Sequence, residues 1–362
     1  MNCCEKLDSA ADPQDGLGET VDFAAPGWAL DRRTALKGLA SLAGGAAVAS
    51  AGGGFAFAQA KPLRLAFCGQ LLCVVPYEVT RDRGHFKAEG LNLELVYTRG
   101  GSQAMQALVG GAVDYAGTSF DVALQAFANG AKISRFASTG RLPLFALAVA
   151  PKNKASLTDL KSLEGKTVGV SGLGNADHVL LLFLVKKAGG DVSKLRVATL
   201  GTNLYDALRL GQVDAGMVQE PALTLILENG GGVLVNAMDI QDAQKYLGGP
   251  YEFMGVSVRT EEREKRLDEM KRLANALRKG LQDTRTIPVE EIVAALPKEL
   301  IAGGDRGQLV AILEKYRLSL WPEDVKIDVA SAGRVADAQI AAGVAKQPYD
   351  LKALLDTAVL GG

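Results

Sequence analysis

Hydrophobic and polar positions along the chain predict a regular succession of strands and helices. Runs that alternate with a period of two, at residues 63–67 and 90–97, are typical of strands. A third strand is expected at 113–117, and helical stretches follow these strands. Further strand and helix pairs begin at 167–170 and 197–200. Strands that alternate with helices in this way form parallel sheets. The sequence therefore predicts an α/β fold, with a mostly helical C-terminal part.

One fourteen-residue pattern occurs twice. GSQAMQALVGGAVD at 101–114 and GTNLYDALRLGQVD at 201–214 share six identical positions, and each predicts a helix that ends on glycine and leads into a strand. Two copies indicate two similar lobes with a ligand cleft between them, and we expect Ser102 and Gln103 to face Thr202 and Asn203 across that cleft. The alternative is that a generic helix-to-strand connection has occurred twice by chance.

The expected lobes follow from the breaks in the pattern. Residues 151–154 form a polar break, which we interpret as the first crossing between lobes, and 248–258 as the return. The first lobe is then 61–150 plus 251–362, and the second is 151–250. Residues 68–76 are expected to form a loop, with a helix from 77 to 86.

Candidate ligand-binding residues follow from the fold class. Ligands of parallel α/β sheets bind beyond the carboxyl ends of the strands, where helices begin and leave N–H groups free. Glycines in such loops let the backbone approach a ligand. The loops selected by this rule give the candidates Cys68, Gly69, Gln70, Gly101, Ser102, Gln103, Thr118, Ser119, Ser171, Gly172, Gly174, Asn175, Asn203, Gln219 and Glu220.

Each polar candidate also has a purely structural interpretation. Ser102 and Gln103, like Thr118 and Ser119, could simply cap the helices that they precede. Charged residues near these loops have alternative roles as well. Asp177 and His178 could line the cleft, with His178 expected to pack against its own lobe. Asp114 and Asp214 are expected to support strand starts, and Arg99 and Arg141 to be solvated, although either could pair with a carboxylate.

Residues 1–60 have the composition of a targeting segment. Arg32 and Arg33 precede a weakly apolar, Ala/Gly-rich run at 38–58, which ends in small-residue cleavage patterns at Ala58 and Ala60. This pattern resembles a twin-arginine export signal. We expect cleavage near Ala58 or Ala60 and a periplasmic location; a membrane anchor is the alternative interpretation.

Composition and charge exclude several functions. A formal net charge of −1 argues against nucleic-acid binding, which needs a basic surface. Two histidines and four cysteines without metal-ligand spacing predict no metal site, and no cofactor is expected. After cleavage only Cys68 and Cys73 remain, either as a disulfide or as two buried thiols.

A set of motifs resembles one known family. The stretch GHFKAEGLNLE at 84–94, the two glycine-bounded repeats, LKSLEGKTVGV at 160–170 and Glu220-Pro221 are similar to landmarks of periplasmic substrate-binding proteins of ABC transporters, in the nitrate, sulfonate and taurine group (SsuA/THI5-like, NMT1 superfamily). The resemblance spans about residues 62–260. It implies a two-lobe, type II periplasmic-binding-protein-like fold, with a ligand cleft between lobes that are each a mainly parallel sheet flanked by helices.

The resemblance also implies a function. A small organic molecule or anion would be captured in the cleft by a monomeric, non-enzymatic protein and delivered to an ABC permease. Two alternatives stay open. Relatives of this fold include a pyrimidine synthase and a desulfinase, so Cys68 or Cys73 could be a nucleophile with His85 or His178 as its base. The second alternative is a ligand sensor that presents its closed form to a membrane receptor.

Overall fold

The computed structural model describes residues 61–301 and 305–360, which contain two five-stranded sheets. The first has the order β2-β1-β3-β10-β4 and the second the order β7-β6-β8-β5-β9. The strands of the first sheet are β1 (Leu63–Cys68), β2 (Leu93–Thr98), β3 (Tyr115–Ser119), β4 (Ile133–Ser138) and β10 (Met254–Arg259). Those of the second are β5 (Ala146–Val149), β6 (Thr167–Val170), β7 (Arg196–Thr199), β8 (Ala215–Val218) and β9 (Gly232–Asn236).

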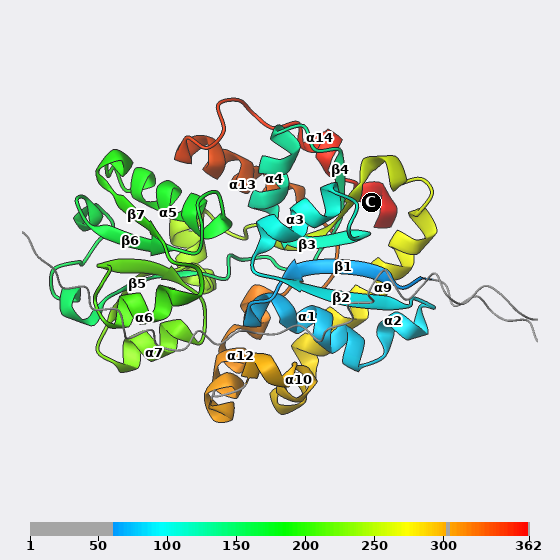
Figure 1. Cartoon of the computed structure of the whole chain (residues 1–362), viewed down its shortest axis with the longest axis horizontal. Helices are drawn as coiled ribbons and strands as arrows, with labels where there is room; N and C mark the ends of the chain where they lie inside the picture. The colour runs from blue at the N-terminus through cyan, green and yellow to red at the C-terminus, as the bar shows by residue number, and fades with distance from the viewer. Residues whose placement is uncertain (1–60, 302–304, 361–362) are drawn as a thin grey trace, which may run out of the picture. The chain divides into compact units, whose positions relative to one another are not determined.

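Helices cover the sheets and fill the C-terminal part (Figure 1). The α-helices are α1 (Leu71–Asp82), α2 (His85–Ala88), α3 (Gly101–Val109), α4 (Phe120–Ala128), α5 (Ala176–Lys187), α6 (Leu204–Arg209), α7 (Ala222–Glu228), α8 (Ile240–Asp242), α9 (Leu267–Thr286), α10 (Val289–Ala295), α11 (Lys298–Ile301), α12 (Arg306–Leu320), α13 (Val329–Ala342) and α14 (Leu351–Leu354). Long α9 packs along α1, and α13 contacts both α4 and α5, which flank different sheets. No helix in the described ranges is long and apolar enough to span a membrane.

The two sheets have equivalent topologies. In each, three parallel strands are followed by one antiparallel strand and a final strand that again runs with the first three. The antiparallel strands are the crossovers, because β5 follows β4 of the first sheet and β10 follows β9 of the second. The predicted α/β class with two mainly parallel sheets is therefore confirmed.

The repeated sequence pattern has the same role in both sheets. Asp114 precedes β3 and its Oδ2 accepts a hydrogen bond from the backbone N–H of Arg64 at 2.8 Å. Asp214 precedes β8 and its Oδ2 accepts from the backbone N–H of Thr167, also at 2.8 Å. Each carboxylate thus accepts from a backbone donor at the start of the neighbouring parallel strand, β1 or β6. The expectation that both aspartates support strand starts is confirmed.

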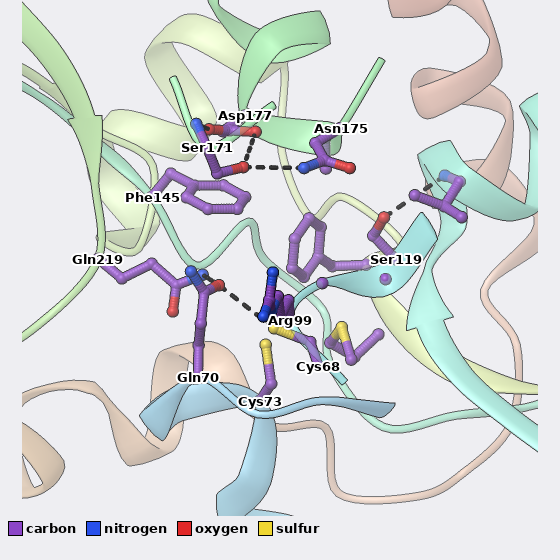
Figure 2. A pocket seen from close by; sticks show the side chains of 16 residues that line it. Cys68, Gln70, Cys73, Arg99, Ser119, Phe145, Ser171, Asn175, Asp177 and Gln219 are labelled. Atoms are coloured by element: carbon purple, nitrogen blue, oxygen red, sulfur yellow. Dashed lines mark hydrogen bonds between the residues drawn. The ribbon is translucent and has the colours of Figure 1, made fainter. Parts of the chain in front are cut away.

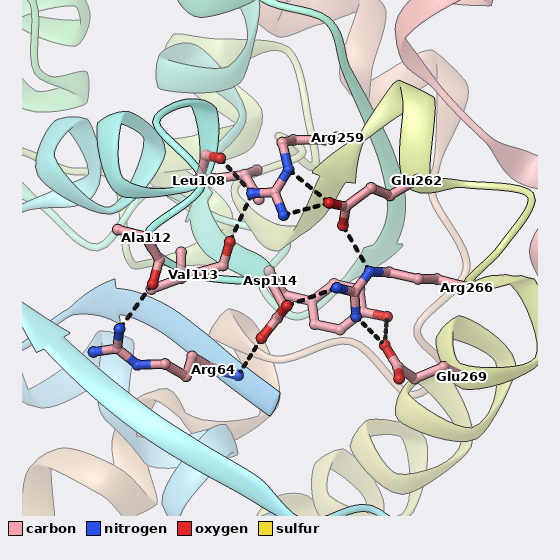
Figure 3. Close-up of polar contacts among 10 residues, drawn as sticks. Arg64, Leu108, Ala112, Val113, Asp114, Arg259, Glu262, Arg266 and Glu269 are labelled. Carbon is pink, nitrogen blue, oxygen red and sulfur yellow. Dashed lines mark hydrogen bonds and ion pairs between the residues drawn. The ribbon is translucent and has the colours of Figure 1, made fainter. Parts of the chain in front are cut away.

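The first copy of the pattern is also anchored to the C-terminal helices (Figure 3). Arg266, just before α9, donates to Asp114 Oδ1 at 2.7 Å. Arg259 at the end of β10 donates to the carbonyls of Leu108 and Val113 at 2.6 and 2.7 Å. Leu108 lies in the last turn of α3, and its carbonyl also accepts from the Gly111 backbone N–H at 3.0 Å, so Arg259 adds a second donor at this helix end.

Two local predictions were wrong. The predicted loop at 68–76 is mostly helix, because α1 already begins at Leu71 and continues through Pro76. Val74 and Val75 are fully buried, so burial favours the helix although proline removes one helical hydrogen bond. The first crossing also precedes the predicted break at 151–154, because β5 pairs with β8 and β9 of the second sheet.

Candidate functional site

A pocket lies where the strand ends of the two sheets meet (Figure 2). Its cavity volume is about 40 Å³. Seven of the predicted residues line it: Cys68, Gln70, Gly101, Ser119, Ser171, Asn175 and Gln219. They lie at the carboxyl ends of β1 and β3 or in the segments after β1, β2, β6 and β8, as expected for a site beyond the carboxyl ends of parallel strands.

Four helix starts border this pocket. Gln70, Ser119 and Asn175 are the N-cap residues of α1, α4 and α5, and α3 begins at Gly101. Each helix has nine or more residues. Helix N-termini carry partial positive charge and unpaired N–H groups. The pocket is therefore suited to a negatively charged or oxygen-rich group.

Hydrogen bonds join the loops of the two sheets around the pocket. Gln219 Nε2 donates to Gln70 Oε1 at 2.6 Å, and Ser102 Oγ donates to Asn175 Oδ1 at 2.7 Å. Gln125 Nε2 of α4 donates to the carbonyl of Gly174 at 2.9 Å. With these contacts made, about 40 Å³ is room for a few waters. A larger ligand must enter while these contacts are open.

The glycine-rich loop 171–178 is held by its own side chains. Asp177 is fully buried and its carboxylate accepts hydrogen bonds from the Ser171 backbone N–H and hydroxyl. Burial raises the pKa of the Asp177 carboxyl, against these hydrogen bonds, which lower it. Asn175 Nδ2 donates to Ser171 Oγ at 3.0 Å. These contacts fix the position of the loop along the wall of the pocket.

Both histidines lie in structural contacts. His178 Nδ1 accepts from the Gly174 backbone N–H at 3.2 Å, and burial lowers the pKa of this imidazole. His178 therefore packs within its own lobe, as expected. His85 Nε2 lies 2.6 Å from Asp283 Oδ2, and neither histidine lines the pocket.

A second cavity of about 220 Å³ adjoins the first. The two share Gln70, Phe145, Ser171 and Gln219 as lining residues. The second cavity adds Glu220 and the start of the second repeat at Thr202, with an apolar wall of Leu71, Leu204, Tyr205, Met217, Val218 and Pro221. The first cavity thus has the larger share of polar lining, and the cavity beside it is more apolar.

Several predicted residues lie outside both cavities: Gly69, Ser102, Gln103, Thr118, Gly172, Gly174 and Asn203. The expectation that Ser102 and Gln103 face Thr202 and Asn203 is wrong, because Ser102 bonds to Asn175 and Gln103 Oε1 accepts from the Arg99 backbone. The two helix starts border adjoining cavities instead. Ser119 does cap α4, accepting from the Val122 backbone N–H at 3.4 Å.

The two arginines near the predicted loops make different contacts. Arg99 lines the first cavity from the loop after β2, where its guanidinium can pair with an anion. Arg141 instead donates to the carbonyls of Leu318 and Ser319 at the end of α12. The alternative of ligand pairing thus survives only for Arg99.

The aromatic residues of the site were missed by the sequence analysis. Phe145 and Phe253 immediately precede β5 and β10, and their rings make an edge-to-face pair with centroids 5.8 Å apart. Because β5 and β10 are antiparallel, their amino ends reach the edge at which the other strands end. A rule that selects residues after strands cannot find residues that precede them. An apolar residue directly before each crossover strand is the sequence signal that could have identified Phe145 and Phe253.

The described part of the chain offers no group of three or more His, Cys, Asp or Glu side chains that could hold a metal ion. Cys68 and Cys73 are both free and buried thiols, so the pair is not joined as a disulfide.

Comparisons with known proteins agree with this geometry. The family model described as NMT1/THI5 like matches residues 74–291. A search of curated proteins found no match. Among solved structures, a protein from Bordetella bronchiseptica RB50 is 24% identical with a TM-score of 0.73, covering 83% of this chain and 95% of its own.

Two further structures are similar in fold. The periplasmic aliphatic sulphonate binding protein SsuA from Escherichia coli has a TM-score of 0.64 and 18% identity, over 81% of this chain and 96% of its own. The periplasmic nitrate-binding protein NrtA from Synechocystis PCC 6803 has a TM-score of 0.65 and 11% identity, over 82% and 86%. The fold is thus that of periplasmic binding proteins, and the chain belongs to the NMT1/THI5-like family.

Proposed function

We propose that this protein is a periplasmic solute-binding protein, which captures a small molecule between its two sheets and delivers it to an ABC permease. The observation that carries the proposal is the pocket itself. Loops from both sheets and four helix starts form it, and hydrogen bonds between the sheets close it. The similar folds of a sulphonate-binding and a nitrate-binding protein support the same role.

The lining favours a ligand with two unlike parts. A negatively charged or oxygen-rich head group suits the helix starts and Arg99. An apolar portion suits the adjoining cavity beside Leu71 and Tyr205. The buried Asp177 disfavours a doubly charged anion directly beside it.

Export completes the proposal. The paired arginines 32 and 33 support twin-arginine export to the periplasm, with cleavage near Ala58 or Ala60; this segment lies outside the described residues. The ligand-binding residues that we propose are the candidates from the sequence that line the two cavities, with pocket residues added: Cys68, Gln70, Gly101, Ser119, Ser171, Asn175, Gln219 and Glu220, with Arg99, Phe145, Asp177 and Phe253. We propose a monomer that binds without turnover; the same pocket in a sensor would present the closed form to a receptor.

A thermal-stability screen tests this proposal. The protein is heated with nitrate, alkanesulfonates, MOPS, small carboxylates, and neutral and cationic compounds of similar size. At a ligand concentration a hundredfold above Kd, binding stabilises the folded state by about 2.7 kcal/mol. We expect at least one anionic compound to raise Tm and to be recovered chemically unchanged. Stabilisation by none of the compounds, by cations alone, or with conversion of the compound to a product would contradict the proposal.

A further inference from the structure

Two thiols lie side by side in the wall of the pocket (Figure 2). Cys68 is the last residue of β1 and Cys73 lies in the first turn of α1. Their exposed fractions are 5% and 3%, and both are free. Both residues line the cavity, so the thiol pair borders the space that a small molecule would enter.

These thiols are connected to the contact that joins the two sheets. Gln70 Oε1 accepts hydrogen bonds from Cys68 Sγ at 3.3 Å and from Gln219 Nε2 at 2.6 Å. Cys73 lines the same cavity as Cys68, Gln70 and Gln219. Through Gln70, the Cys68 thiol is therefore linked to the Gln70–Gln219 contact between loops of different sheets.

The two sulfur atoms are not equivalent. The hydrogen bond from Cys73 lowers the pKa of the Cys68 thiol, in opposition to burial. The same contact, together with burial, raises the pKa of Cys73 well above its usual range. Cys68 is thus the more acidic of the two thiols, and the thiolate is the nucleophilic form of cysteine.

We propose that Cys68 and Cys73 are a redox-active dithiol, which a hydroperoxide converts to an intramolecular disulfide inside the pocket. The Cys68 thiolate attacks the terminal peroxide oxygen, the O–O bond breaks, and the departing alkoxide or hydroxide takes up a proton. Cys73 sulfur then attacks the resulting Cys68 sulfenic acid. The S–O bond breaks, the proton of Cys73 leaves with the hydroxide as water, and the two thiols have given two electrons to the peroxide.

Oxidation would also loosen the pocket. A disulfide draws the sulfur atoms to about 2.05 Å and removes both S–H donors. Gln70 then loses the Cys68 thiol as a donor and keeps only Gln219, so the contact between the sheets is less well held. This consequence rests on the proposed function, because it concerns closure around a ligand; formation of the disulfide does not.

Peptide mass mapping of the full chain tests the disulfide. Trypsin releases both cysteines on one peptide, residues 65–81, while Cys3 and Cys4 lie on residues 1–6. After treatment with hydrogen peroxide and alkylation in denaturant, we expect peptide 65–81 to lack both alkyl groups, to be lighter by two hydrogen atoms than the reduced peptide, and to recover with dithiothreitol. A doubly alkylated peptide, sulfinic or sulfonic acids, or a link to peptide 1–6 would overturn the proposal.

Single variants test the roles of the two sulfur atoms. In Cys73→Ser, peroxide should leave a sulfenic acid on Cys68 that dimedone labels, whereas Cys68→Ser should give at least tenfold slower labelling of Cys73. Equal or reversed labelling would overturn this assignment.

Amide hydrogen exchange at residues 171–177 should be faster in the oxidised than in the reduced chain; unchanged exchange would overturn the effect on closure. A negative ligand screen leaves the mass result standing, so the two proposals fail separately.

Discussion

Replacing Arg135 with methionine is expected to lower the free energy of unfolding by about 3–5 kcal/mol. Arg135 on β4 is fully buried, and its Nη2 lies 3.1 Å from Glu252 Oε1, itself only 2% exposed. The guanidinium also donates to the carbonyls of Thr118 and Phe253. Removing it leaves the carboxylate buried and unpaired, just before the crossover strand β10.

Chemical denaturation of the unchanged chain and the variant measures this loss. Burial already raises the pKa of Glu252, with Arg135 opposing the rise, so the loss should be larger at pH 8 than at pH 5. Arg209→Met is the control, because its pair with Asp206 is exposed and contributes at most about 1 kcal/mol. Equal losses in the two variants would contradict this account of the buried pair.

Asp121 is expected to make the protein less stable as the pH rises from about 4 to about 7. Its buried carboxyl, in the first turn of α4, lies near Tyr251, Gln339 and Arg135, with Tyr349 farther away. Burial raises its pKa from 3.8 to about 7. The folded state therefore binds a proton that the unfolded state has lost. The contribution of Asp121 to the free energy of unfolding is full below pH 4. It falls by about 1.4 kcal/mol per pH unit as the pH rises, or by about 4 kcal/mol in all.

Asp121→Asn should remove this dependence of the free energy of unfolding on pH. Urea unfolding at several pH values between 4 and 8 should show the variant gaining on the unchanged chain by up to about 4 kcal/mol as the pH rises. Asp268→Asn, at an exposed position of α9, is the matched control and should keep the original profile. Parallel profiles for the Asp121 variant and the unchanged chain would contradict the raised pKa.

The fold could be predicted largely because its signals are local and repeated. Alternation of strands and helices, and the two copies that end in Asp114 and Asp214, correspond to equivalent positions in the two sheets. The start of α1 could not be predicted, because Pro76 reads as a helix boundary and the burial of Val74 and Val75 depends on distant packing with α9.

The site was only half predictable for a similar reason. Residues after parallel strands, such as Gln70 and Gln219, can be identified from the strand pattern alone. Phe145 and Phe253 reach the pocket only because β5 and β10 cross between the sheets and run antiparallel. Strand direction is a property of the pairing between distant segments, and no local pattern encodes it.

The most direct test of the central claim compares ligand stabilisation in two matched double variants. Asn175→Ala with Gln219→Leu alters the pocket, whereas Asn129→Ala with Gln212→Leu makes the same changes on exposed turns. For the anion that stabilises the unchanged chain, we predict at least tenfold weaker binding, about 1.4 kcal/mol, in the pocket variant and unchanged binding in the control. Equal affinity in both would place the ligand elsewhere and contradict the pocket between the two sheets as the binding site.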